Sequence, residues 1–183
     1  MLKEFKPTIF FLLKFAIIFG IGSFLYGSYI SSFRKQEPPK TDDFTVWVAS
    51  QTNALLVTLG YESHLWYPEK EPIVVIYIDG YEEDNVSFYE GCNGVNIMIL
   101  FVAFVFAFGN RYKQMVWFIP VGLLAIHLFN LMRLVSLSLM ATLSHSVFHF
   151  THKFAFTGVI YAFVLVLWYL WATKFGKPEL DEK

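Results

Sequence analysis

The amino-acid sequence predicts an all-α polytopic membrane protein, with about four transmembrane helices and a small extracytoplasmic α+β insertion between the first and the second. Of its 183 residues, 56% are apolar and only 16% are charged, a balance typical of membrane proteins rather than soluble domains. The apolar residues form long runs, and eleven of the fifteen acidic residues lie between Ser31 and Gly91. We expect membrane lipid around the apolar runs and no nucleic-acid partner, because no basic patch marks a phosphate-binding surface.

The first apolar run, Thr8–Ile30, is long enough to cross the roughly 30 Å hydrocarbon layer as a helix. A cleaved signal peptide would have a shorter apolar core followed by a small-residue cleavage site. The sequence shows neither feature. Residues 1–30 are therefore predicted to be a cytoplasmic N-terminal end and a retained transmembrane helix.

Residues 31–91 are predicted to form a water-exposed region outside the membrane. Apolar residues recur at helical spacing over Phe44–Leu59 and end before Gly60, which predicts an amphipathic helix on the membrane surface or against the bundle. β-Branched residues dominate Pro72–Asp79, and the shorter run Val86–Tyr89 follows an acidic turn. This pattern predicts two short paired strands.

Residues 92–173 contain the other predicted spans and are expected to form a catalytic transmembrane core, followed by a cytoplasmic tail over residues 174–183. The spans are Cys92–Phe108, Met115–Leu143 and Phe154–Thr173. With four spans, the basic residues of both chain ends and of the turn after the second span fall on one side, which marks that side as cytoplasmic. The acidic region is therefore expected to face the outside of the cytoplasmic (inner) membrane.

Three reactive side chains are predicted to lie at one depth. Cys92, the only cysteine, begins a span that runs inward. Arg133 lies 18 residues past Met115 on a span that runs outward, which is a rise of about 27 Å. His152 directly precedes the last inward span. All three are therefore expected at the outer edge of the hydrocarbon layer.

These residues and their neighbours also have structural interpretations. A lone cysteine is usually a small buried apolar residue, whereas a charge inside a span costs at least ~2.5 kcal/mol and makes Arg133 a functional candidate. Asn130 and Asn96 lie one turn from Arg133 and Cys92, where an amide often joins two helices by a hydrogen bond. His127, about 9 Å deeper than Arg133, is expected to be a packing residue.

The histidines near the last span allow two kinds of chemistry. His145, His149 and His152 would share one helical face and could bind a metal, but zinc needs further ligands that the neighbouring sequence lacks. We therefore expect neither a metal nor another cofactor. A cysteine beside an arginine and an imidazole is instead favoured as a thiolate, and a base in hydrogen-bond reach completes a thiol nucleophile. This second set predicts acyl transfer at the membrane surface.

Three motifs occur in order at the outer ends of the spans: Glu90-Gly91-Cys92-Asn93-Gly94, then Asn130-Leu131-Met132-Arg133, then a histidine just before the last span. This ordered set resembles the exosortase/archaeosortase family of membrane transpeptidases over roughly Glu90–Trp171. The size of the chain and the layout of its outer region look like the short stand-alone branch, exosortase F. Larger members often have Cys-Ser-Gly where this chain has Cys-Asn-Gly.

The resemblance implies a cysteine peptidase or transpeptidase whose partner is the C-terminal sorting signal of an exported protein, made of a short motif, one transmembrane helix and a basic tail. By family role, Cys92 would attack the scissile carbonyl, and Arg133 would stabilise the oxyanion or the substrate carbonyl. His152, or alternatively His149, would donate a proton to the leaving amine. Asn93, where this chain departs from the Cys-Ser-Gly of larger members, would add an oxyanion donor. An acceptor amine or water would then resolve the thioester.

Two other function classes fit the composition. A non-enzymatic assembly or chaperone subunit would hold a partner protein with its outer region and would not need Cys92. A metal-binding membrane component would use the three histidines. The glycines on both sides of the cysteine favour the enzyme, because they let a substrate backbone approach closely, which an assembly subunit does not require.

Overall fold

In a computed structural model of the chain, residues 5–80, 86–109, 112–141 and 156–175 are described. Within them, three helical segments are long and apolar enough to cross a membrane: α1 (Lys6–Arg34), α4 (Tyr112–Ala141), and Gly158–Phe175, where α6 (Phe156–Leu170) continues into the π-helical segment η2 (Trp171–Phe175). A shorter apolar helix, α3 (Val95–Phe108), precedes α4. The predicted fold class, a mostly helical polytopic membrane protein, is confirmed.

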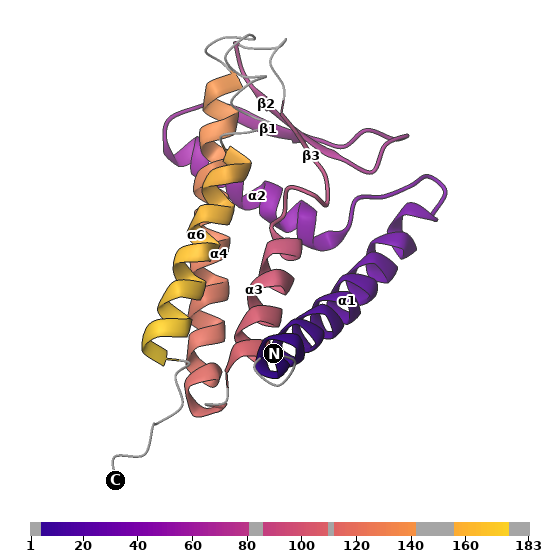
Figure 1. Cartoon of the computed structure of the whole chain (residues 1–183). Coiled ribbons are helices and arrows are strands. Elements are labelled where there is room, and N and C mark those ends of the chain that lie inside the picture. Colours follow the sequence, from indigo (N-terminus) through magenta and orange to yellow (C-terminus); the bar gives the residue numbers. More distant parts are fainter. Residues whose placement is uncertain (1–4, 81–85, 110–111, 142–155, 176–183) are drawn as a thin grey trace.

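The membrane helices pack around an apolar core. Helices α3, α4 and α6 contact one another, and α1 leans against α3 (Figure 1). The core is formed by buried side chains of α3, α4, α6 and η2, namely Phe101, Val105, Met115, Phe118, Ile126, Val164 and Trp171. Gly122 of α4 permits close packing against α3, because a Cβ there would overlap the ring of Phe101.

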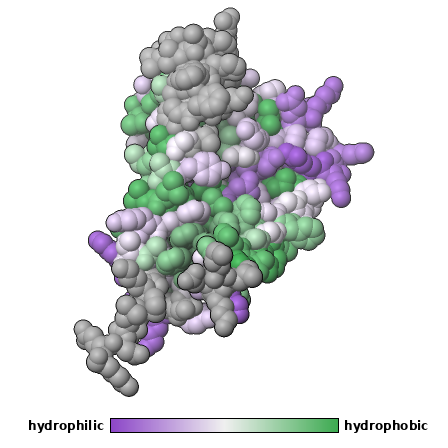
Figure 2. Space-filling view, viewed as in Figure 1, coloured by the Kyte–Doolittle hydropathy of each residue, from purple (hydrophilic) through white to green (hydrophobic). Residues whose placement is uncertain are grey.

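The surface of α1 is apolar and little covered by the rest of the chain. Its exposed side chains include Phe10, Leu13, Ile17, Phe24 and Leu25. Figure 2 shows hydrophobic surface across the middle of the molecule and up its left side, with hydrophilic residues gathered at the upper right and fewer near the lower end. This distribution suits a multi-pass membrane protein, in which apolar helix faces contact lipid.

Helix α3 begins three residues later than the predicted span. Gly94 adopts a left-handed conformation (φ 84°), which favours glycine, and the side chain of Asn93 accepts a hydrogen bond from the N–H of Val95 (3.0 Å). Cys92 therefore lies in a turn before the helix, and the prediction that it starts the helix is wrong. With 14 residues, α3 is about 21 Å long.

Between α1 and α3 the chain forms a region that we call the cap, which consists of α2 (Asp43–Thr58) and a three-stranded antiparallel sheet in the order β1-β2-β3. The predicted helix is confirmed, as is the pairing of β2 (Val74–Ile78) with β3 (Val86–Phe88). Strand β1 (Ser63–Trp66) pairs with the other side of β2 and was not predicted.

The cap packs on the C-terminal part of α4. Helix α2 lies between the sheet and the membrane helices (Figure 1) and contacts β1, β2 and α4. The shared core contains buried side chains of α2, β2, β3 and α4, namely Val48, Leu56, Val74, Ile76, Phe88, Leu131, Leu134 and Leu137. The N-terminal part of α4 therefore packs in the membrane core and its C-terminal part packs against the cap. The residues near Arg133 lie where these two cores meet.

Candidate active site

Cys92 lies in the turn that connects β3 to α3. Its N–H donates a hydrogen bond to the carbonyl of Tyr89 (2.8 Å), which closes the turn. The side chain is half-buried and packs against the core that the cap shares with α4. The thiol is therefore held at the junction between the cap and the membrane helices.

Helix α4 holds the carbonyl oxygen of Cys92 with two side chains. Asn130 Nδ2 donates to it at 3.0 Å and Arg133 Nη2 donates to it at 3.2 Å. The two residues are three positions apart and so share one face of the helix. The structure thus brings together Cys92, Asn130 and Arg133, three residues that sequence analysis selected from segments about 40 positions apart.

The guanidinium of Arg133 has no carboxylate partner among the described residues. The ion pairs found there are Arg34–Glu90 and His64–Asp79. Arg133 Nε and Asn130 Oδ1 are both buried and have no hydrogen-bond partner within the described part of the chain. Because an arginine presents five N–H donors, this side chain keeps donors for an anionic group in addition to the one that it gives to Cys92.

Burial raises the pKa of the Cys92 thiol above its usual value, because the thiolate would lose hydration in this position. A hydrogen bond from the Tyr89 backbone and the positive charge of Arg133 offset part of this increase. The thiol is therefore protonated at neutral pH. Because the thiolate is the nucleophilic form, the site requires a base to use this cysteine for catalysis.

Sequence analysis missed Tyr89, whose side chain interacts with the thiol of Cys92. The ring lies against Gly91, where a Cβ would overlap it. The nearby Cys92 is the main cause that raises the pKa of the Tyr89 phenol, so the phenol keeps its proton and can donate it to a hydrogen bond. An exposed aromatic residue at the end of a strand carries no sequence signal of such a role.

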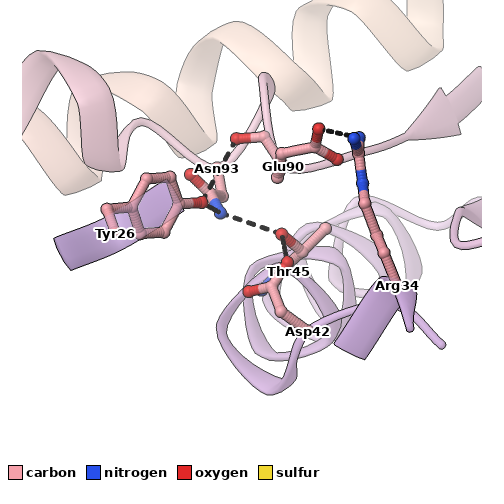
Figure 3. A network of polar contacts seen from close by, with 6 residues as sticks. All are labelled: Tyr26, Arg34, Asp42, Thr45, Glu90 and Asn93. Carbon is pink, nitrogen blue, oxygen red and sulfur yellow. Dashed lines mark hydrogen bonds and ion pairs between the residues drawn. The ribbon is translucent and has the colours of Figure 1, made fainter. Parts of the chain in front are cut away.

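Asn93 is almost completely buried. Its Nδ2 donates to the hydroxyl oxygens of Tyr26 (2.7 Å) and Thr45 (2.8 Å), as Figure 3 shows. Both amide hydrogens are thus in use, and its oxygen accepts from Val95. This arrangement favours a supporting role for Asn93 over that of an oxyanion donor.

The other selected residues lie apart from this group or outside the described residues. Asn96 is exposed and lines a cleft of about 350 Å³ between α1 and α3. His127 packs against the cap, since its ring stacks on Trp47 and its Nε2 lies 2.8 Å from Gln51 Oε1, but its buried Nδ1 has no hydrogen-bond partner among the described residues. The remaining histidines lie outside the described residues, namely His145, His149 and His152. Within the described part of the chain, no three potential metal ligands gather.

The raised pKa of Cys92 predicts the pH dependence of its alkylation. The rate of reaction with iodoacetamide should rise with pH. Its midpoint should lie above pH 8.5, roughly the pKa of an ordinary cysteine, because burial raises the pKa of the Cys92 thiol. Replacing Arg133 with glutamine should move the midpoint further upward, since the guanidinium favours the thiolate. Mass spectrometry of the intact protein measures the rate at this single cysteine. A midpoint below 8.5 would contradict the prediction.

The fold and the site together define a multi-pass membrane protein with a cysteine and an arginine in contact where a small cap meets the membrane helices. A family model of the transmembrane exosortases matches residues 5–171, which is well over half of the chain. The chain therefore belongs to the transmembrane exosortase family. No curated protein and no solved structure matched it. The family match includes α1 and the cap, which lie outside the motifs noted in the sequence.

Proposed function

We propose that this exosortase is a membrane-embedded cysteine transpeptidase or protease, which cleaves the C-terminal sorting signal of exported proteins at the outer face of the cytoplasmic membrane. The observation that carries the proposal is the contact between Cys92 and Arg133 (3.2 Å from Nη2 to the carbonyl oxygen), together with the absence of a carboxylate partner for Arg133 among the described residues. A cation left without a structural counterion beside the only thiol suits a reaction that creates negative charge.

Arg133 is proposed to stabilise the oxyanion that forms when the thiol attacks the scissile carbonyl. A fixed donor is most effective where water is scarce, and Arg133 is half-buried. In the present structure one of its nitrogens binds the Cys92 carbonyl, but Asn130 binds the same oxygen. Arg133 can therefore turn toward a substrate while Asn130 keeps that carbonyl hydrogen-bonded.

The protonated thiol calls for a base, and we assign this role to His152, with His149 as the alternative. The imidazole takes the thiol proton as the sulfur bonds to the scissile carbonyl carbon. It then gives the proton to the nitrogen of the leaving amine as the C–N bond breaks, which leaves a thioester on Cys92. An acceptor amine or water attacks that thioester and restores the thiol.

The proposed substrate signal consists of a short motif, one transmembrane helix and a basic tail. Placing the cap outside the membrane follows from the basic residues near both chain ends, which favour the cytoplasm. The cut would then occur where the substrate helix leaves the membrane, level with Cys92. The small outer region, with one helix and one three-stranded sheet, supports assignment to the exosortase F branch.

The test of this proposal is to trap the thioester. The chain is expressed with an exported protein from the same genome that ends in such a signal and carries an epitope tag before it. We expect acid-quenched membranes to contain the tagged fragment joined to this chain, and neutral hydroxylamine to release it. Because Cys92 is the only cysteine, the bond can lie only there.

The matched control is Cys92→Ser, whose ester would resist neutral hydroxylamine. Processing of the substrate without any hydroxylamine-sensitive adduct, even when the acceptor step is slowed by low temperature, would contradict the proposed mechanism. Absence of processing in every combination of chain and signal would instead favour the assembly-subunit alternative.

A further inference from the structure

A chain of polar side chains connects α1 and α2 to the residue that follows Cys92 (Figure 3). Asn93 Nδ2 donates to Thr45 Oγ1 at 2.8 Å and to Tyr26 Oη at 2.7 Å. Thr45 in turn donates from its hydroxyl to Asp42 Oδ2 at 2.6 Å, and its backbone N–H donates to Asp42 Oδ1 at 3.0 Å. We call Tyr26, Asp42, Thr45 and Asn93 the tether.

The donors and acceptors of the tether are arranged in only one way. Thr45 has a single hydroxyl hydrogen and gives it to Asp42, so its oxygen must accept from Asn93. Tyr26 likewise accepts from Asn93, which leaves its own hydrogen for the carbonyl of Glu90 (3.5 Å). The orientation of the Asn93 amide is therefore fixed by its partners.

Three members of the tether are almost completely shielded from solvent. The exposed fractions are 3% for Asp42 and 1% for both Thr45 and Asn93. A buried amide that loses its acceptor finds no water to replace it, so such a loss is unfavourable. Moving the Asn93 side chain would leave buried polar groups without hydrogen bonds, which raises the free energy of the folded state. The oxygen of the same amide also accepts a hydrogen bond from the first N–H of α3.

The turn at Cys92 is consequently held at two adjacent residues. Helix α4 binds the carbonyl of Cys92 through Asn130 and Arg133. Helices α1 and α2 bind Asn93, the next residue, through the tether. Because the two attachments are one residue apart, loosening either one changes the position of the thiol relative to Arg133.

We propose that Tyr26, Asp42 and Thr45 are positioning residues, which act through Asn93 to hold the Cys92 turn against Arg133. Their hydrogen bonds reach Asn93 and the carbonyl of Glu90 rather than the thiol. Helix α1 was predicted only as a membrane anchor. In this proposal it also helps to position the nucleophile, through Tyr26. The effect on catalysis rests on the proposed function, whereas the effect on the thiol itself does not.

The experiment measures the alkylation of Cys92 by iodoacetamide across a pH series, in the full chain reconstituted in lipid nanodiscs. Thr45→Val keeps the shape of the side chain and removes its hydroxyl, and Tyr26→Phe removes only the phenol oxygen. Thr45→Ser restores the hydroxyl. The matched control is Thr52→Val, because Thr52 is equally buried in α2 but its hydroxyl donates to Val48 O of the same helix (2.9 Å) and, among the described residues, to no part of the tether.

Thr45→Val and Tyr26→Phe are expected to raise the alkylation rate at pH 7 by roughly fivefold to thirtyfold, the change in population that accompanies loss of one buried hydrogen bond. They should also lower the pH midpoint toward that of an ordinary thiol, since a loosened turn exposes the sulfur. Thr45→Ser and Thr52→Val should stay within twofold of the wild type. With a processed substrate, kcat should fall while KM changes little.

The proposal is overturned if Thr45→Val and Tyr26→Phe both match Thr52→Val in rate and midpoint. If Thr45→Val does not accumulate, Tyr26→Phe alone decides the question, because a phenylalanine fits the same half-buried place. A wild-type chain that processes no substrate would contradict the proposed function but would leave this alkylation comparison intact, so the two failures can be told apart.

Discussion

Replacing Cys92 with alanine should abolish cleavage of a sorting signal, with a loss on the order of 10⁴-fold or more, because removal of a catalytic nucleophile leaves only residual binding effects. No other thiol can substitute, since the chain contains one cysteine. The variant should still accumulate in membranes, because the turn is held by the backbone of Cys92 and by the side chain of Asn93. Immunoblots of tagged substrate measure the cleaved fraction over time.

A suitable control for this variant is Ser138→Ala. Ser138 is buried in α4, and its hydroxyl donates to the carbonyl of Leu134 in the same helix (3.0 Å). Its replacement should leave cleavage within a few-fold of the wild type. Full cleavage by Cys92→Ala would remove the enzyme hypothesis and favour the alternative, in which the cap holds a partner protein and the cysteine is dispensable.

Replacing Arg133 with alanine should lower kcat by roughly 10²- to 10³-fold, the usual effect of losing one oxyanion donor. KM should change much less, since the proposed interaction forms with the developing charge rather than with the bound substrate. Arg133→Lys should retain part of the activity, because a lysine keeps the charge but lacks the planar fork of donors. The measurement is the initial rate of cleavage over a range of substrate expression levels.

The loss at Arg133 should arise from chemistry rather than from collapse of the turn. Asn130 still binds the Cys92 carbonyl in the Arg133→Ala variant, and the tether still holds Asn93. The control is Met132→Ala, because Met132 is the exposed neighbour on the same helix. If Arg133→Ala cleaves within tenfold of the wild type, the arginine does not stabilise the transition state.

Hydropathy and spacing were sufficient to predict most of the helices. The long apolar runs of α1 and α4 and the amphipathic spacing of α2 each appear directly in the sequence, and a count of residues along α4 was enough to predict Arg133 at the depth of Cys92. Strand β1 was missed because its four residues alternate only weakly between half-buried and exposed positions. Its pairing with β2 is a contact between segments about ten residues apart in the sequence, and the local pattern of four residues does not predict it.

The start of α3 and the tether could not be predicted for a related reason. The apolar run gives no sign that Gly94 turns left-handed or that the side chain of Asn93 accepts a hydrogen bond from the N–H of Val95. Tyr26 and Thr45 lie 67 and 48 positions from Asn93, in segments whose polar residues look like ordinary helix surface. Only the packing of α1 and α2 around the turn selects these two hydroxyls.

The length of α3 has a consequence for the bilayer around it. A helix of about 21 Å is shorter than the roughly 30 Å of hydrocarbon, and a bilayer answers such a mismatch by thinning locally. Headgroups and water then descend toward the start of α3, where the Cys92 turn lies. A peptide that unwinds there can keep its N–H and C=O groups hydrated, which the undisturbed hydrocarbon would forbid. Under the proposed function, the shortness of α3 would therefore make a membrane-embedded substrate segment accessible to the thiol of Cys92.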